Sequence, residues 1–73
     1  MLTNEDKKAL DDILKTCILA LHGSPVIMSW VEDEEEGMIH YMFELSNLYV
    51  LDAKLTYVKD GFGLRITGTS ITV

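Results

Sequence analysis

The N-terminal third of the chain carries apolar residues at intervals of three and four, which predicts an amphipathic α-helix over about residues 3–22. Thr3 is a favourable N-cap, and Asp6 three residues later gives the spacing of a capping box. Gly23 predicts the C-terminal end of the helix, because Pro25 follows it and cannot continue the helix. The apolar stripe expected to face the core consists of Leu10, Ile13, Leu14, Cys17 and Leu21.

The last turns of this helix are apolar on more than one side. Leu19 lies across the helix cylinder from Leu21, and Ile18 widens the stripe. We therefore expect the end of the helix to be covered from a second direction. Since no other segment has a helical pattern, a neighbouring subunit is the expected cover.

From Val26 onward the pattern changes to the alternation of β-strands. The predicted strands cover about residues 26–31, 38–45, 48–58, 62–67 and 70–73. One alternating row of large apolar side chains is expected to face the helix, and it consists of Ile39, Tyr41, Phe43, Leu45, Tyr49, Leu51, Ala53, Leu55 and Tyr57.

The turns between these strands are predicted from short polar or glycine-containing pairs. Asp60-Gly61 predicts a hairpin with a type I′ turn. Gly68-Thr69 predicts a second tight turn. At Ser46-Asn47 two alternatives stay open, a turn or a bend in one long strand, because the alternation continues unbroken through this point.

These elements predict one domain over residues 1–73, since a chain of this length cannot build a second core. The expected fold class is α+β, with one N-terminal amphipathic helix packed on a four- to five-stranded antiparallel sheet. A sheet of this kind can also curl toward a small barrel, and the sequence leaves that alternative open.

The sheet face turned away from the helix is expected to be apolar as well. A single helix covers one face of a sheet, and the opposite face should then be polar. Its candidate residues are Met28, Trp30, Met38, Met42 and Val50. Methionine is common at adaptable binding surfaces, so these residues indicate an interface unless the sheet closes over them.

So short a chain needs additional stabilisation, because cores of this size rarely supply more than about 3–5 kcal/mol. Cys17 is the only cysteine, which excludes a disulfide within the chain, indicates a reducing compartment and predicts a small core residue. His22 and His40 lack the spacing of a zinc site, and we expect no metal. Self-association, in the simplest case a homodimer, is the expected source of stability.

Five consecutive carboxylates separate two apolar segments: Glu32, Asp33, Glu34, Glu35 and Glu36. They lack the alternating ligands of a calcium loop, and solvated carboxylates lack the displaced pKa that acid–base catalysis requires. In an extended segment, Glu32, Glu34 and Glu36 would share one side. Such a row can attract a basic surface or guard neighbouring strands against aggregation, and the guarding role is the commoner one.

Net charge narrows the class of partner. Twelve acidic residues against six basic ones give a charge of −6, which disfavours binding to a phosphate backbone and favours a basic protein. No catalytic constellation or cofactor motif is present, so we expect neither an enzyme nor a cofactor. The charged N-terminus and the short apolar segment after it predict a cytoplasmic protein that is not membrane-bound.

Two short segments, "NLYVLDA" and "ITGTSITV", resemble the Sm-like family of RNA-binding rings. The positions that match are Asn47, Asp52, Ala53, Ile66, Gly68 and Ile71. The resemblance implies a ring-shaped oligomer that binds nucleic acid. The sequence departs from that family at Thr67, where a base-contacting Arg is expected.

The leading functional hypothesis is a small acidic protein-interaction module, such as an inhibitor or modulator, that presents carboxylates to a basic partner surface. The candidate partner-binding residues are the acids Glu32, Asp33, Glu34, Glu35 and Glu36 together with Met28, Trp30, Met38 and Met42. The alternative is the Sm-like oligomer that binds nucleic acid.

Overall fold

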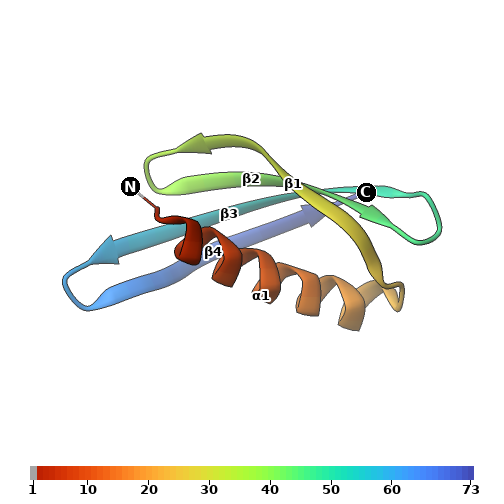
Figure 1. Cartoon of the computed structure of the whole chain (residues 1–73), viewed down its shortest axis with the longest axis horizontal. Coiled ribbons are helices and arrows are strands. Elements are labelled where there is room, and N and C mark those ends of the chain that lie inside the picture. The colour runs from red at the N-terminus through yellow and green to blue at the C-terminus, as the bar shows by residue number, and fades with distance from the viewer. Residues whose placement is uncertain (1) are drawn as a thin grey trace.

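The computed structural model describes residues 2–73 and consists of one helix followed by four strands (Figure 1). The elements are α1 (Asn4–His22), β1 (Val26–Glu35), β2 (Met38–Leu45), β3 (Val50–Asp60) and β4 (Gly63–Thr72). The strands pair antiparallel in the order β1-β2-β3-β4, and α1 covers one face of the sheet. The predicted α+β class is confirmed, and the sheet does not close into a barrel.

Both predicted ends of the helix are confirmed. The Asp6 backbone N–H donates to Thr3 Oγ1 at 3.1 Å, and the Thr3 N–H donates to Asp6 Oδ2 at 3.0 Å, which completes the capping box. At the other end, Gly23 takes a left-handed conformation with φ 68° and donates its N–H to the Leu19 carbonyl at 2.9 Å.

Asp6 also joins the start of the helix to the sheet, because its carboxylate accepts a hydrogen bond from Lys59 Nζ of β3. The Lys59 ammonium, helped by the Thr3 N–H, lowers the pKa of Asp6 from 3.8 to about 2.

The core-facing stripe of the helix differs from the predicted one. The buried helix residues are Leu10, Leu14 and Ile18. Leu21 is 71% exposed, and Ile13 and Cys17 are exposed as well, so their predicted places in the core were wrong. A helix packed on one face of a sheet is contacted from one side only, and the row formed by Leu10, Leu14 and Ile18 fills that contact. Leu21 belongs to the same side of the helix but lies in its last turn, beyond the end of this row.

Contacts at the β1 side of the helix fix this rotation. Lys7 Nζ lies 2.7 Å from a carboxylate oxygen of Glu34, and Ser29 Oγ donates to Asp11 Oδ1 at 2.6 Å. Both partners in the sheet belong to β1, so the polar flank of the helix is held against that strand. The other flank, which contains Ile13, is left toward solvent.

The predicted alternating row forms the sheet half of the core. Eight of its nine members are buried: Ile39, Tyr41, Phe43, Leu45, Leu51, Ala53, Leu55 and Tyr57. Tyr49 precedes β3 and is exposed. The buried Tyr41 hydroxyl donates to the Lys7 carbonyl at 3.0 Å, and burial, followed by nearby Asp11 and Glu34, raises the pKa of Tyr41 to about 12.

Two of the turns test the predictions made for them from the sequence. Residues 46–49 form a turn and not a strand bend, with Leu48 at φ 69° and the Tyr49 N–H donating to Asn47 Oδ1 at 3.2 Å. The hairpin after Asp60 is present, but the type I′ prediction was wrong, because the positive φ of this turn lies at Gly63 (117°) and not at Asp60 or Gly61.

The predicted turn at Gly68-Thr69 was also wrong, since β4 runs through it as one strand. Thr56 pairs with Gly68 and Tyr57 pairs with Ile66, which leaves Thr67 as the extra residue of a β-bulge. A Cβ at residue 68 would lie 2.8 Å from Thr56 Oγ1. Glycine therefore leaves room for the Thr56 side chain at this point and does not reverse the chain.

The corrected stripe predicts a large difference between two leucines of the same helix. Leu14→Ala should lower the free energy of unfolding by about 2–5 kcal/mol, because it leaves a cavity in the core. Leu21→Ala should change it by less than about 0.5 kcal/mol, because the side chain is exposed. Urea unfolding of both variants checks this, and equal losses would restore the stripe predicted from the sequence.

The contact between Asp6 and Lys59 predicts a specific dependence of stability on pH. Because the pKa of Asp6 is lower in the folded state than its ordinary value, this carboxylate stabilises the fold above pH 3.8, and its contribution is lost as the pH falls toward 2. Asp6→Asn should lower the melting temperature at pH 7 and flatten its decline between pH 4 and 2. Thermal melts across this range give the measurement, with Asp12→Asn as the control that keeps the wild-type slope.

Candidate functional site

The sheet face opposite α1 is not covered by any part of the chain that the structure describes, and it carries the predicted apolar residues. Strand register places Trp30 opposite Met42, and Glu35 opposite Met38, on this face. Met28 is 50% exposed and Trp30 is 38% exposed, while Met38 and Met42 are half-buried. We call Met28, Trp30, Met38, Met42 and Val50 the open face.

Four of the five acids, Glu32–Glu35, lie in a strand and not in a loop. Strand β1 continues four residues past the predicted end at residue 31, and the register shifts between Val31 and Asp33, where Glu32 is the extra residue of a bulge. Beyond the bulge, Asp33 pairs with His40 and Glu35 pairs with Met38. Asp33 and Glu35 therefore lie on the same side of the sheet as the open face.

Glu32 lies beside the aromatic centre of the open face. The Trp30 indole Nε1–H donates to Glu32 Oε2 at 3.2 Å. This contact places a carboxylate at the edge of the indole. The bulge thus gathers Glu32 with Asp33 and Glu35, whereas simple alternation would have separated them.

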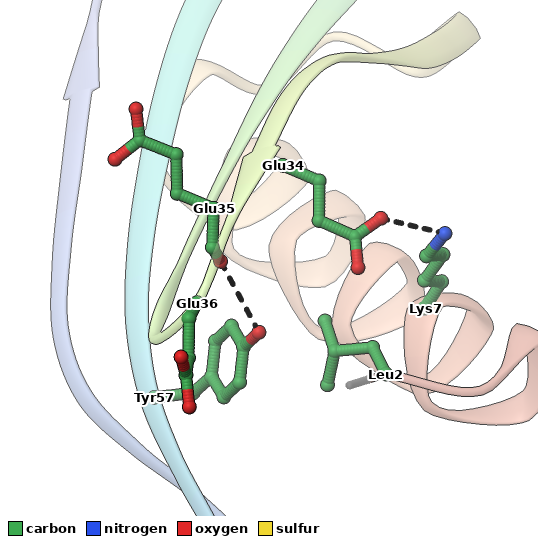
Figure 2. Close-up of a pocket in the computed structure, with 6 residues that line it drawn as sticks. All are labelled: Leu2, Lys7, Glu34, Glu35, Glu36 and Tyr57. Carbon is green, nitrogen blue, oxygen red and sulfur yellow. Dashed lines mark hydrogen bonds and ion pairs between the residues drawn. The ribbon is translucent and has the colours of Figure 1, made fainter.

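The remaining two acids lie elsewhere, so the predicted row of Glu32, Glu34 and Glu36 on one side was wrong. Glu34 pairs with Ile39 in the register and points toward the helix, where it meets Lys7 (Figure 2). Glu36 lies in the turn between β1 and β2. The acidic run is therefore divided between two surfaces of the molecule.

Glu34 and Glu36 belong to a groove of 530 Å³ between the start of α1 and the end of the β1–β2 hairpin. Its lining residues are Leu2, Lys7, Glu34, Glu35, Glu36 and Tyr57. The Tyr57 hydroxyl donates to the Glu35 carbonyl at 3.4 Å, and the Glu35 carboxylate points away from Lys7 and from the Tyr57 ring (Figure 2). Glu34 is already paired with Lys7, a cation of its own chain.

The centre of the sheet adds charged residues to the surroundings of the open face. His40 is hydrogen-bonded to Asp52, and Glu44 lies opposite Met28. Lys54 lies opposite His40 on the same face. Asp52 and Glu44 were not among the predicted site residues, although the alternation of their strands places both on this side.

The described residues offer no arrangement typical of metal binding. Within residues 2–73, no group of three or more His, Cys, Asp or Glu side chains is placed to hold a metal ion.

The single arginine, Arg65, is paired with Asp60 at 3.2 Å. In the same part of the chain, α1 is too polar to be a membrane-spanning helix.

No family model, curated protein or solved structure matches this chain. The resemblance to Sm-like rings therefore depends on the quoted residues alone.

The position of Trp30 on the open face predicts how strongly a quencher in solution reduces its fluorescence. Because Trp30 is partly exposed, acrylamide should quench its fluorescence in the native state, though less strongly than in urea-unfolded protein. The Glu32→Gln variant, which keeps a hydrogen-bond acceptor at the indole, should be quenched to the same extent as the wild type. Native fluorescence that resists quenching would show that the open face is covered.

Proposed function

We propose that this chain is a small acidic protein-interaction module whose open face binds a basic segment of another protein. The observation that supports the proposal best is the exposed Trp30, held by Glu32 and bordered by methionines on a face that α1 leaves uncovered. Tryptophan is enriched among the residues that dominate binding energy at interfaces.

The apolar part of the face supplies a surface that can adapt to a partner. Met42 of β2 lies directly opposite Trp30, and Met28 is two residues before Trp30 on the same side of β1. Methionine has three rotatable bonds and a polarizable sulfur, so it can fill gaps against side chains of different shape. A partner segment with apolar residues could therefore pack on this strip and remove it from water.

The carboxylates determine the kind of partner. Glu32, Asp33 and Glu35 follow Trp30 along β1, and Asp33 and Glu35 are two residues apart on an extended strand, which separates them by about 6.8 Å. Lysine or arginine side chains spaced along a partner segment can contact such a row. An arginine near Trp30 could also stack on the indole while it pairs with Glu32.

Nucleic acid is disfavoured as a partner for this face. The cationic residues on this side of the sheet are Lys54 and Arg65, and Arg65 is already paired with Asp60. The carboxylates around them would repel phosphates.

A protein of this kind would act as an inhibitor or modulator by covering a basic surface that its partner uses elsewhere.

Neutralising the three acids that adjoin the open face should weaken binding of a basic segment. The probe is a synthetic peptide that alternates arginine and leucine, titrated into labelled protein at low salt while amide chemical shifts are recorded. The triple variant Glu32→Gln, Asp33→Asn, Glu35→Gln should bind about tenfold more weakly, since each exposed pair contributes about 0.2–1 kcal/mol. The shifts of the wild type should map to β1 and β2.

The matched control removes the same number of charges elsewhere. Glu5→Gln, Asp12→Asn, Glu36→Gln leaves the open face intact and should retain near-wild-type affinity. Equal weakening of both triple variants would mean that only net charge matters. Shifts confined to α1 would also contradict a binding role for the open face.

A further inference from the structure

The two edges of the sheet differ sharply in how they are protected. An exposed edge strand can pair with another chain, and proteins normally discourage this with charges, bulges or proline. The β1 edge has two register shifts and four consecutive acids, Glu32–Glu35. The β4 edge has one register shift, at Thr67, and a single charged residue, Arg65, which Asp60 neutralises.

Strand β4 is therefore a long edge that is ready to accept another strand. It extends over ten residues, Gly63–Thr72, and β3 is its only neighbour among the described residues. The N–H and C=O groups on its outer side are directed away from the sheet. Its sequence is rich in threonine and isoleucine, which favour strand pairing.

The helix-facing side of β4 is also incompletely covered. Register with β3 places Ile66 opposite Tyr57 and Ile71 opposite Ala53, so both lie at the border of the core. Ile66 is 38% exposed, and Ile71 is only half-buried. A further strand beside β4 would bring side chains against this border and shield it from water.

We propose that β4 pairs antiparallel with β4 of a second copy, which joins the two sheets into one of eight strands. A twofold axis perpendicular to the sheet makes the interface self-complementary, because each edge presents the same strip to the other and the one charge of that strip, Arg65, is paired with Asp60. Threonine and isoleucine side chains then meet across the new ladder, and such β-branched pairs stabilise antiparallel strands.

The charge distribution favours a second copy despite the net charge of −6. In the joined sheet the two acidic β1 strands would be seven strand spacings apart, or about 34 Å. Salt screens charges over about 8 Å at physiological ionic strength. The acids that would oppose self-association are thus too distant to prevent it.

The size of the interface predicts a weak dimer. A ten-residue strand edge is about 34 Å long and roughly 10 Å tall, so the contact covers roughly 340 Å² on each copy. Stable interfaces bury about 800 Å² on each partner. The proposed dimer should therefore form and dissociate reversibly with concentration.

Thr69 gives a sharp test because its exposed side chain lies on the apolar, helix-facing side of β4, opposite Leu55. Neither charge sign would find a partner on that side of a second β4. Thr69→Lys and Thr69→Glu should both weaken dimerisation about tenfold or more in sedimentation equilibrium, whereas Thr69→Val should maintain or strengthen it. Wild-type amides of β4 should become protected from hydrogen exchange as concentration rises.

The matched control is Ile27→Lys, which introduces the same charge at the exposed start of β1 and should leave dimerisation unchanged. Circular dichroism and a urea midpoint establish that each variant is folded. A monomeric wild type at millimolar concentration overturns the proposal, as does a dimer that Thr69→Lys leaves intact or that Ile27→Lys disrupts. These measurements contain no basic peptide, so their outcome is independent of the proposed partner binding.

Discussion

The rest of the structure depends on the packing of a single helix against a single face of a four-stranded sheet. Leu10, Leu14 and Ile18 form the helix half of this contact, and the row that includes Tyr41 and Phe43 forms the sheet half. One helix cannot also cover the opposite face or the outer edge of β4. Every surface to which a binding role is assigned above is a place that this one contact leaves open.

Most of the fold could be predicted because its signals are local. The capping box at Thr3 and the left-handed Gly23 are determined by residues within a few positions of each helix end. The buried row from Ile39 to Tyr57 follows from alternation in strands without an internal bulge. The rotation of the helix could not be predicted, because contacts such as Lys7 with Glu34 join residues far apart in the chain.

The errors in the candidate site have one physical cause, which is the interruption of alternation by bulges. Simple alternation placed Glu32 and Glu34 on the same side as Trp30. The register shift after Val31 instead turns Glu34 toward Lys7 and brings Asp33 and Glu35 to the side where Glu32 contacts Trp30. A bulge depends on how two strands fit together, and one strand's sequence does not reveal it. The apolar residues of the open face were identified correctly as a group because Met38 and Met42 lie in β2, where alternation is regular.

The open face and the β4 edge would support each other if one molecule used both. A twofold axis perpendicular to the joined sheet keeps both open faces on the same side, so a dimer would present two acidic faces in one direction. A partner with two basic segments could then bind both, and the second contact would form at the high effective concentration set by the first. Weak self-association and weak electrostatic contacts would together give strong binding only to partners whose basic segments match the spacing of the two faces.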